Sequence, residues 1–348
     1  MRNVPQVPKR SVTSYDVARA VGVSQSAVSR AFTPGSPIAE AKRLLILDAA
    51  RALGYQPNAI ARSMSSARVG ERQRSGLVGL VVTRLHDPFF ANAIEMFSQQ
   101  LQARGWHMVL FTVEDASEVD HALQELMRYK VDGVVVLSAL LSGHMAETCR
   151  ANRTPVVLYN RAASDPRIGS VRIDNIAGAR LAAEVLVAAG HQRIALVCGP
   201  EGDPTSQERE AGLRQRLAEA GLSLFRREAG DYTFESGHEA AMRLFALGER
   251  PDAVFCASDV MALGVLHCAR HEFALAVGET LSIIGFDDIP AACWPGHSLT
   301  TIRQPVAQMC REAVEILVTQ MEGGTPLRPH LMMPGALILR GSARRPAD

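Results

Sequence analysis

The sequence predicts an all-α head of the helix-turn-helix type, followed by an α/β core of two doubly wound lobes with parallel sheets. Three observations predict this fold. Residues 14–33 hold two short helical segments on either side of a glycine turn. From residue 76 onward, apolar runs alternate with helical segments, which is typical of parallel α/β sheets. That region spans about 270 residues, and this length favours two lobes over one.

Three residues at fixed spacing define the helix-turn-helix. Ala18 is small enough for two helices to cross closely, and Gly22 tolerates the positive φ of a tight turn. Val28 is placed to pack back against the crossing. An ordinary helical hairpin is the alternative, and the three constraints together favour the helix-turn-helix.

Capping residues predict where the helices of the head begin. Thr13, with Asp16 three residues later, forms a capping box, and Ser24 caps the second helix. A third helix is expected over residues 39–53, with Gly54 ending it. Its apolar face is expected to consist of Leu44, Leu45, Leu47, Ala49 and Leu53.

The second helix carries side chains that suit the edges of DNA bases. Gln25, Ser26 and Ala27 are expected to be exposed in its first turn, and Ser29 and Arg30 to reach the same side one turn later. In a helix-turn-helix, such residues meet base edges in the major groove. Glutamine pairs with adenine, arginine pairs with guanine, and an alanine methyl contacts the thymine methyl. We therefore expect this helix to read DNA.

The charge is distributed unevenly along the chain, although the net charge is only +1. Residues 1–74 contain 12 Lys and Arg against 4 Asp and Glu, a net +8, whereas the remainder contains 25 against 32, a net −7. A small basic domain is what the neutralisation of DNA phosphates requires. A solvated basic face is the alternative, but the basic excess coincides with the helix that is expected to read DNA.

Composition excludes several protein classes. With 47% apolar and 21% charged residues, the chain is typical of soluble globular proteins. The N-terminus lacks the apolar stretch of a signal peptide, and no run of about 18 apolar residues is present, so a cytoplasmic protein without membrane contact is expected. The six cysteines form no CxxC pair, so we expect no disulfide and no structural zinc. We also expect no other metal site and no cofactor.

The chain is expected to contain a head over residues 11–57, a hinge helix and linker over 58–75, and a two-lobed core over 76–341. Residues 65–76 are polar and show no period, which is typical of a linker. Seven apolar runs of the core are predicted as strands: Leu77–Val82, His107–Phe111, Gly133–Leu137, Val156–Tyr159, Ile194–Cys198, Ala253–Cys256 and Leu281–Gly285.

Polar residues follow several of these runs. Open α/β sheets bind ligands at the carboxyl ends of their strands, so these residues predict a ligand cleft between the lobes. They are found at Thr83–Phe90, Asn160–Arg161, Ser258–Asp259 and Asp287–Asp288, and Arg209 lies in a helix that opens after the run ending at Cys198.

From Thr13 to Gly341 the sequence resembles the LacI family of bacterial transcription regulators. The order and spacing of several stretches carry the resemblance: Tyr15–Arg19, Val21–Ser24, Ala27–Arg30, Leu53–Arg62, Ala257–Gly264, Ile284–Asp288 and Leu299–Pro305. It implies a homodimer that binds a near-palindromic operator and a small effector. The expected DNA contacts are Thr13, Ser14, Tyr15, Ser24, Gln25, Ser26, Ala27, Ser29, Arg30, Tyr55, Asn58, Ala61 and Met64.

The resemblance also implies that residues 58–65 form a hinge helix, two copies of which enter the minor groove. Met64 stands where the family usually has leucine, and its side chain is expected to open a central base step. A helix residue that packs on its own module is the alternative. Two further departures affect the coupling between head and core, namely Ala39 in place of a capping Ser or Thr and a longer linker.

For the effector, the resemblance implies that Arg209 and Asp287 clamp the ligand. Arginine donors, a carboxylate acceptor and an aromatic face suit a sugar, polyol or sugar acid. The alternatives are that Asp287 caps a loop and that Arg209 pairs with Glu208 or Glu210 on the surface. The surrounding residues are expected to be Phe89, Phe90, Asn160, Tyr232, Ser258 and Asp259, with Ser258 standing where asparagine is common.

Three other interpretations are weaker. A dinucleotide-binding enzyme would use Gly76–Gly79 and a metalloenzyme His267 with His271, but the glycines lack a strand-turn-helix context and no ligand set with zinc spacing accompanies the histidines. A periplasmic sugar-binding protein shares the two lobes but has no DNA-binding head. We favour a repressor released by an inducer, and a corepressor remains open because no motif encodes the sign of the response.

Overall fold

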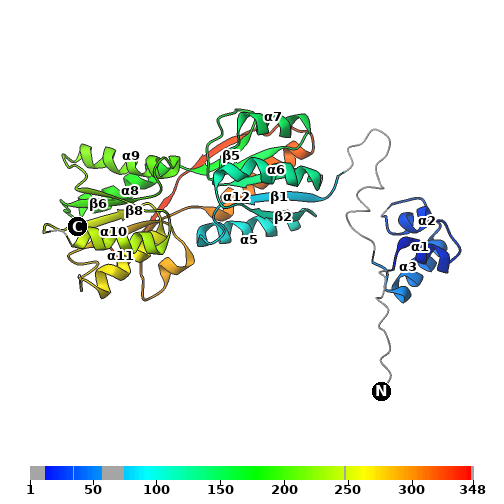
Figure 1. The fold of residues 1–348 in the computed structure, drawn as a ribbon, viewed down its shortest axis with the longest axis horizontal. Coiled ribbons are helices and arrows are strands. Elements are labelled where there is room, and N and C mark those ends of the chain that lie inside the picture. The colour runs from blue at the N-terminus through cyan, green and yellow to red at the C-terminus, as the bar shows by residue number, and fades with distance from the viewer. Residues whose placement is uncertain (1–11, 34, 57–73, 247, 346–348) are drawn as a thin grey trace, which may run out of the picture. The chain divides into compact units, whose positions relative to one another are not determined.

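The computed structural model describes residues 12–33, 35–56, 74–246 and 248–345. The chain divides into two compact units, Met1–Leu77 and Val78–Asp348, which we call the head and the core (Figure 1). The predicted hinge residues Asn58, Ala61 and Met64 lie outside the described residues.

Three short helices form the head: α1 (Ser14–Ala20), α2 (Gln25–Ala31) and α3 (Glu40–Leu53). The capping box at the start of α1 is present, because the Thr13 backbone N and hydroxyl donate to the Asp16 carboxylate over 2.9 and 2.7 Å. The Ser24 hydroxyl accepts from the Ala27 backbone N at 3.2 Å, and Gly22 has a φ of 65° in the turn. The predicted caps and turn are therefore confirmed.

The predicted apolar face of α3 is wrong at three of its five positions, whereas Leu47 and Ala49 are half-buried. Ile46 and Ala50 are the buried residues of this helix, four positions apart, and they pack with Val17 and Val28. The prediction followed the large leucines instead of this spacing. The exposed side chains include three that it placed inside, Leu44, Leu45 and Leu53.

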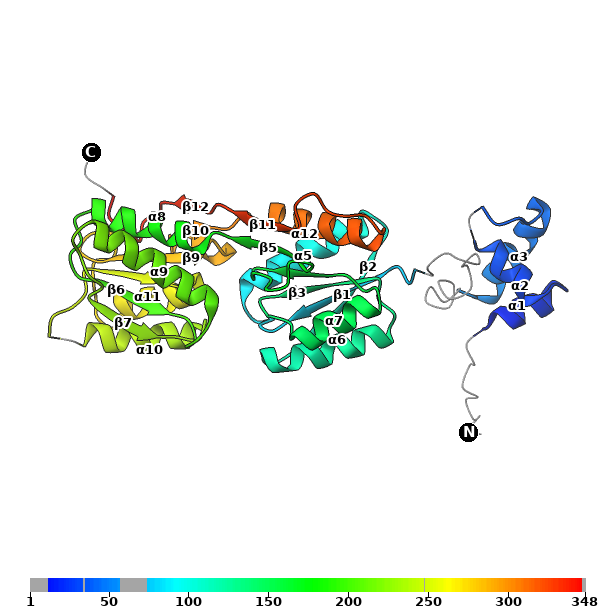
Figure 2. The ribbon, with the colours of Figure 1, turned by 90° about the horizontal axis from the view of Figure 1, so that it is seen from above.

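The first lobe of the core contains a six-stranded sheet in the order β11-β5-β4-β3-β1-β2. Its strands are β1 (Leu77–Val82), β2 (His107–Thr112), β3 (Gly133–Leu137), β4 (Val156–Tyr159), β5 (Gly169–Ile173) and β11 (His330–Met333). Helices α5 (Pro88–Gln102) and α12 (Val306–Met321) cover one face, and α6 (Val119–Arg128) and α7 (Gly143–Ala151) cover the other (Figure 2). The pairs from β1 through β3, β4 and β5 to β11 are parallel.

The second lobe repeats this architecture with the strand order β12-β10-β9-β8-β6-β7. Its strands are β6 (Ile194–Cys198), β7 (Arg226–Ala229), β8 (Ala253–Cys256), β9 (Ser282–Asp287), β10 (Thr300–Arg303) and β12 (Ala336–Ile338). Helices α8 (Asn175–Ala188) and α9 (Pro204–Glu219) lie on one face, and α10 (Phe234–Phe245) and α11 (Asp259–His271) lie on the other. Only β12 is antiparallel to its neighbour among these pairs of the described strands.

The strands buried on both faces match the predicted runs closely. Strands β1, β3, β4, β6 and β8 have the predicted bounds, and β3, β6 and β8 are buried at every position, as expected for central parallel strands. Five short strands were not predicted, because they are polar or lie near sheet edges: β5, β7, β10, β11 and β12. The predicted two-lobed fold is confirmed.

The chain passes between the lobes three times, after β5, after β10 and after β11. Two of these crossings are joined, because the Asp174 backbone N donates to the Met333 carbonyl at 2.8 Å. The carboxyl ends of β1 and β4 in the first lobe face those of β6 and β9 in the second (Figure 1). The polar residues that follow these strands therefore come together where the lobes meet.

Candidate functional site: a DNA-reading helix and a pocket between two lobes

Helix α2 presents polar side chains at its N-terminal end. Gln25, Ser26 and Arg30 are exposed, and Tyr15 of α1 has 68% of its surface exposed. The Gln25 amide donates to the Ser14 hydroxyl at 3.3 Å, so the two helices share a polar surface. This surface can donate to and accept from base edges.

One predicted DNA contact, Ala27, is buried, and another, Tyr55, is half-buried. Ala27 is only 4% exposed, because it lies in the core of the head beside Val28, and its predicted exposure is wrong. Tyr55 is half-buried, and its ring lies edge-on to Phe32 with the centroids 5.8 Å apart. Both residues therefore support the head from within, and we no longer assign a base contact to Ala27.

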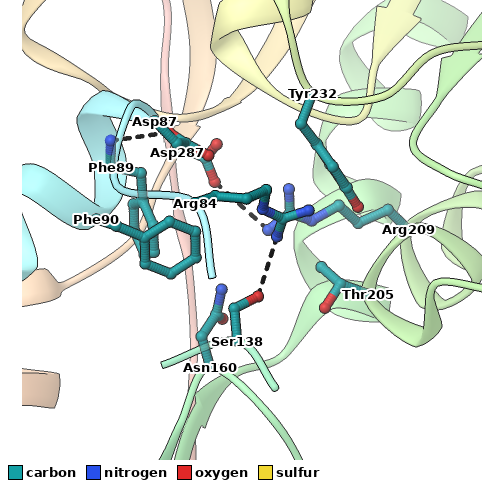
Figure 3. A pocket seen from close by; sticks show the side chains of 10 residues that line it. All are labelled: Arg84, Asp87, Phe89, Phe90, Ser138, Asn160, Thr205, Arg209, Tyr232 and Asp287. Carbon is teal, nitrogen blue, oxygen red and sulfur yellow. Dashed lines mark hydrogen bonds and ion pairs between the residues drawn. The ribbon is translucent and has the colours of Figure 1, made fainter. Parts of the chain in front are cut away.

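The core contains a pocket between its lobes, lined by residues of both. Figure 3 shows Phe89 and Phe90 on one side, Tyr232 on the other, and charged groups converging between them. Ten residues line it: Arg84, Asp87, Phe89, Phe90, Ser138, Asn160, Thr205, Arg209, Tyr232 and Asp287. Six of the eight predicted effector residues are among them.

The other two predicted residues, Ser258 and Asp259, do not line the pocket. Ser258 caps α11 by accepting from the Met261 backbone N, and it is 1% exposed. Asp259 is fully buried, where it accepts from the Ile289 backbone N at 2.9 Å and from the Thr301 hydroxyl at 2.5 Å. Burial raises the pKa of Asp259 to about 7, and the hydrogen bonds from Thr301 and Ile289 oppose that shift. Both residues hold the loops behind the pocket.

Arg209 and Asp287 form a buried pair at the floor of the pocket. The Arg209 guanidinium donates to the Asn175 side chain at 2.9 Å, to the Ala257 carbonyl and to Asp287 at 3.4 Å. It also lies over the Phe286 ring, 3.7 Å from the centroid. Burial raises the pKa of Asp287, whereas the Arg209 charge lowers it.

The surface alternative for Arg209 does not hold. Arg209 is 2% exposed, whereas Glu208 pairs with Arg172 at 2.8 Å and Glu210 pairs with Arg214 at 2.7 Å. The Asp287 carboxylate also accepts from the Gln304 amide at 2.7 Å. The predicted juxtaposition of Arg209 with Asp287 is therefore present.

Four pocket residues were not predicted as site residues: Arg84, Asp87, Ser138 and Thr205. Arg84 donates to the Ser138 hydroxyl at 3.0 Å, and its guanidinium lies 4.4 Å from the centroid of the Tyr232 ring in the other lobe. Asp87 caps α5 by accepting from the Phe89 backbone N at 3.0 Å, and burial raises its pKa. Arg84 and Asp87 belong to the polar stretch after β1, which was the only sequence signal for them.

Backbone conformation also marks the pocket. Four of the nine non-glycine residues with positive φ in the described ranges line it: Ser138, Asn160, Tyr232 and Asp287. Such conformations cost free energy and tend to concentrate at ligand sites. Asn160 is the least strained of the four by type, since asparagine tolerates the left-handed region.

Asn160 offers an unused acceptor to the pocket. Its side-chain oxygen is buried and has no hydrogen-bond partner among the described residues. Figure 3 places this side chain beneath Phe90 and beside Ser138. A buried acceptor without a partner is costly, so a hydroxyl or amino group of a ligand would be stabilised there.

An ion pair joins the lobes beside the pocket. Arg161 follows β4 in the first lobe and lies 2.5 Å from the Asp203 carboxylate in the second, and it also donates to Thr205. Burial raises the pKa of Asp203, but the Arg161 charge and a hydrogen bond from Tyr232 outweigh burial, so the pKa is lowered. The ionised pair therefore holds the lobes together in this structure.

Comparison with known proteins identifies the family. Residues 13–58 match the bacterial regulatory proteins of the lacI family, and residues 162–343 match a periplasmic binding protein-like domain. The HTH-type transcriptional repressor CytR of Escherichia coli (strain K12) is 34% identical over 337 residues, which cover 96% of this chain and 97% of CytR. The chain belongs to the LacI family. Like its relatives, this LacI-family chain is a DNA-binding transcription regulator with a helix-turn-helix head.

Other LacI-family proteins are similar over the whole chain. The ribose operon repressor of Escherichia coli (strain K12) is 30% identical over 335 residues, covering 95% of this chain and 99% of that protein. The lac repressor dimer bound to operator and the anti-inducer ONPF aligns with a TM-score of 0.82 and 27% identity, covering 96% of this chain and 100% of that one. The CelR–cellobiose complex aligns with a TM-score of 0.70 and 30% identity, covering 95% and 99% of the two chains. These named relatives are transcription regulators.

No helix of the described residues is long and apolar enough to cross a membrane.

Proposed function

We propose that this protein is a homodimeric repressor whose affinity for a near-palindromic operator is controlled by a small effector bound between the lobes of the core. The observation that carries the proposal is the combination, in one chain, of a helix that exposes Gln25, Ser26 and Arg30 with a pocket lined by Arg209, Asp287 and an unpartnered Asn160 oxygen. One unit supplies the DNA-reading surface and the other supplies the control site.

The pocket chemistry favours a polyhydroxylated effector, namely a sugar, polyol or sugar acid. Arginine donors and carboxylate acceptors alternate around it, and Phe89 and Phe90 offer an apolar face to the C–H side of a sugar ring. Relatives named for ribose and a relative complexed with cellobiose support this class. Release from DNA on binding, as an inducer, is the response we favour.

In the proposed organisation, residues 11–57 form the head, residues 58–75 form the hinge helix and linker, and residues 76–341 form the effector-binding and dimerisation core. Met64 of the hinge is proposed to open a central base step of the operator, with Asn58 and Ala61 contacting the backbone and groove. The protein works in the cytoplasm, where operator DNA is found, and it catalyses no reaction.

Two experiments test the proposal. Thermal-shift screening of the core, residues 76–348, against sugars, sugar acids and polyols identifies the effector, because a ligand at 100 times its Kd adds about 2.7 kcal/mol of stability. Selection of bound sites from random DNA by the full-length protein identifies the operator. Absence of any enriched palindromic site would contradict the repressor assignment.

A further inference from the structure

A second group of side chains with metal-binding chemistry lies away from the pocket, on helices α10 and α11. His238 of α10 comes together with Cys268 of α11 and with Glu272, which ends that helix. One ligand atom from each residue, a ring nitrogen, the thiol sulfur and a carboxylate oxygen, lies within 4.8 Å of the others. The proposed function uses none of these three residues.

The packing of two parallel helices creates this group. Gly237 of α10 and Gly264 of α11 lie at the crossing, where an added Cβ on either would overlap backbone atoms of the other helix. The helices therefore approach closely, and α10 lies beside α11 along its length (Figure 1). Cys268 and Glu272 are four residues apart and share one face of α11, and that face meets His238.

The sequence motif His267-Cys-Ala-Arg-His271 contributes its cysteine to this group. The metalloenzyme interpretation had instead used its two histidines. The rings of His267 and His271 lie 4.8 Å apart and pack on each other, with His267 also 5.8 Å from the Phe234 ring. The cysteine between them points into the helix interface instead and is buried. His238 comes from the neighbouring helix α10, so the spacing of residues within the α11 motif did not reveal it as a ligand.

We propose that His238, Cys268 and Glu272 form a binding site for a divalent metal ion of the Zn²⁺ class, with water in the fourth position. Zn²⁺ prefers this mixture of imidazole nitrogen, thiolate sulfur and carboxylate oxygen, and three protein ligands leave one tetrahedral position open. Ligand atoms around Zn²⁺ are about 3.3–3.8 Å apart, so a shift of roughly 1 Å, within reach of the exposed Glu272 side chain, closes the site.

The geometry is already partly organised for the metal. His238 Nε2 contacts the Glu272 carboxylate directly, so the two side chains converge on one point beside the buried Cys268 sulfur. Coordination would replace this contact and tie α10 to α11. Because the ion binds the folded chain, it is expected to raise the melting temperature.

The test uses the full-length protein, freed of metal and with its thiols reduced, titrated with Co²⁺ and then with Zn²⁺. We expect one Co²⁺ per chain, with an intense near-ultraviolet absorption band from the bond between thiolate and metal, and displacement of Co²⁺ by Zn²⁺. Cys268→Ser should abolish the band, and His238→Gln and Glu272→Gln should each weaken binding at least about tenfold. Cys293→Ser removes an exposed cysteine elsewhere and is the matched control, which should bind like the parent.

Three results would overturn the assignment. The first is saturation with Co²⁺ without a thiolate band. The second is parental affinity in both His238→Gln and Glu272→Gln, which change exposed or half-buried side chains and leave the buried cysteine in place. The third is loss of binding only in His267→Gln and His271→Gln, which would show that the metal binds these surface histidines instead of the proposed site.

Discussion

At the scale of single residues, most polar groups of the pocket hydrogen-bond to one another, but the Asn160 oxygen and the Arg84 Nε are buried without a partner among the described residues. Arg209 and Asp287 were predictable from the sequence, because the helix after β6 and the end of β9 both point toward the cleft in a two-lobed fold. Ser258 lies equally close to a strand end, but its hydroxyl caps a helix, and sequence position alone does not distinguish these uses. Arg84 reaches the pocket only because its long side chain crosses to Tyr232 in the other lobe, a contact that no local pattern encodes.

Replacing Asn160 by glycine tests the unpartnered oxygen. Glycine accepts the φ of 60° found at this position, so the fold should persist, while the effector loses one hydrogen bond. We expect effector affinity to fall by about tenfold, or ~1.4 kcal/mol, in calorimetry. Lys130→Gly is the matched control, because Lys130 has a φ of 53° in the same lobe and is exposed away from the pocket. Equal effector affinity in the two variants would remove Asn160 from the site.

Replacing Gln25 and Ser26 tests base reading by α2. Both side chains are exposed at the start of the helix, so changing them should alter which half-site is preferred without unfolding the head. Selection from random DNA with the double variant Gln25→Ala/Ser26→Ala measures this preference. Arg51→Ala, at the exposed end of α3, is the control, because loss of its charge can weaken binding to all DNA but should leave the preferred half-site unchanged. An unchanged half-site in the double variant would contradict the assignment.

At the scale of elements, the fold was predictable where burial is complete and less so where it is partial. Central strands such as β3 and β6 read as uninterrupted apolar runs because helices cover both of their faces. Strand β7 is mostly exposed and begins with two arginines, so no apolar run marks it. In α3, the position of the core was misread because the two buried residues, Ile46 and Ala50, are outnumbered by exposed leucines.

The ion pair between the lobes is expected to contribute strongly to the stability of the core. Both partners are nearly buried, with 9% and 7% side-chain exposure, so Arg161→Met leaves the Asp203 carboxylate largely unpaired. Loss of one partner of a buried pair costs about 3–5 kcal/mol, measured as the free energy of unfolding in urea. Arg180→Met breaks an exposed pair with Glu219 and should cost less than about 1 kcal/mol. Similar losses in the two variants would show that Arg161 adds little.

The loop between α8 and β6 carries a buried histidine that predicts a pH dependence. Burial lowers the pKa of His191 below 6.5, and its ring contacts the Ser282 hydroxyl at 2.7 Å. The folded chain therefore binds fewer protons at this residue than the unfolded chain does. The contribution of His191 to the free energy of unfolding is present above pH 6.5 and is lost as the pH falls through the folded pKa. Stability should fall by at most about 1.4 kcal/mol per pH unit from this group.

The measurement compares the free energy of unfolding at pH 7.5 and 5.5 in parent and His191→Gln. The difference between the two pH values should be smaller in the variant. Exposed His144→Gln is the control and should behave like the parent. An identical pH dependence in all three proteins would show that His191 does not contribute to the pH dependence of stability.

At the scale of the whole molecule, the protein links two units with opposite surface chemistry. The head and its linker carry a net charge of +8, and the remainder carries −7, so attraction to DNA resides in the head, while the core is free to bind a small molecule. Control then requires that the effector bind more tightly to one of two arrangements of the core. Coupling between the effector pocket in the core and the DNA-binding surface of the head is therefore what makes the chain a regulator.

The most direct test titrates the operator DNA with full-length protein, with and without the effector found by screening. Fluorescence anisotropy of the labelled operator measures binding. We expect the effector to change operator affinity by about 5- to 150-fold, and Asn160→Gly to need about tenfold more effector for the same change. Lys130→Gly should respond as the parent does. An effector that binds the core yet leaves operator affinity unaltered at saturation would contradict the account.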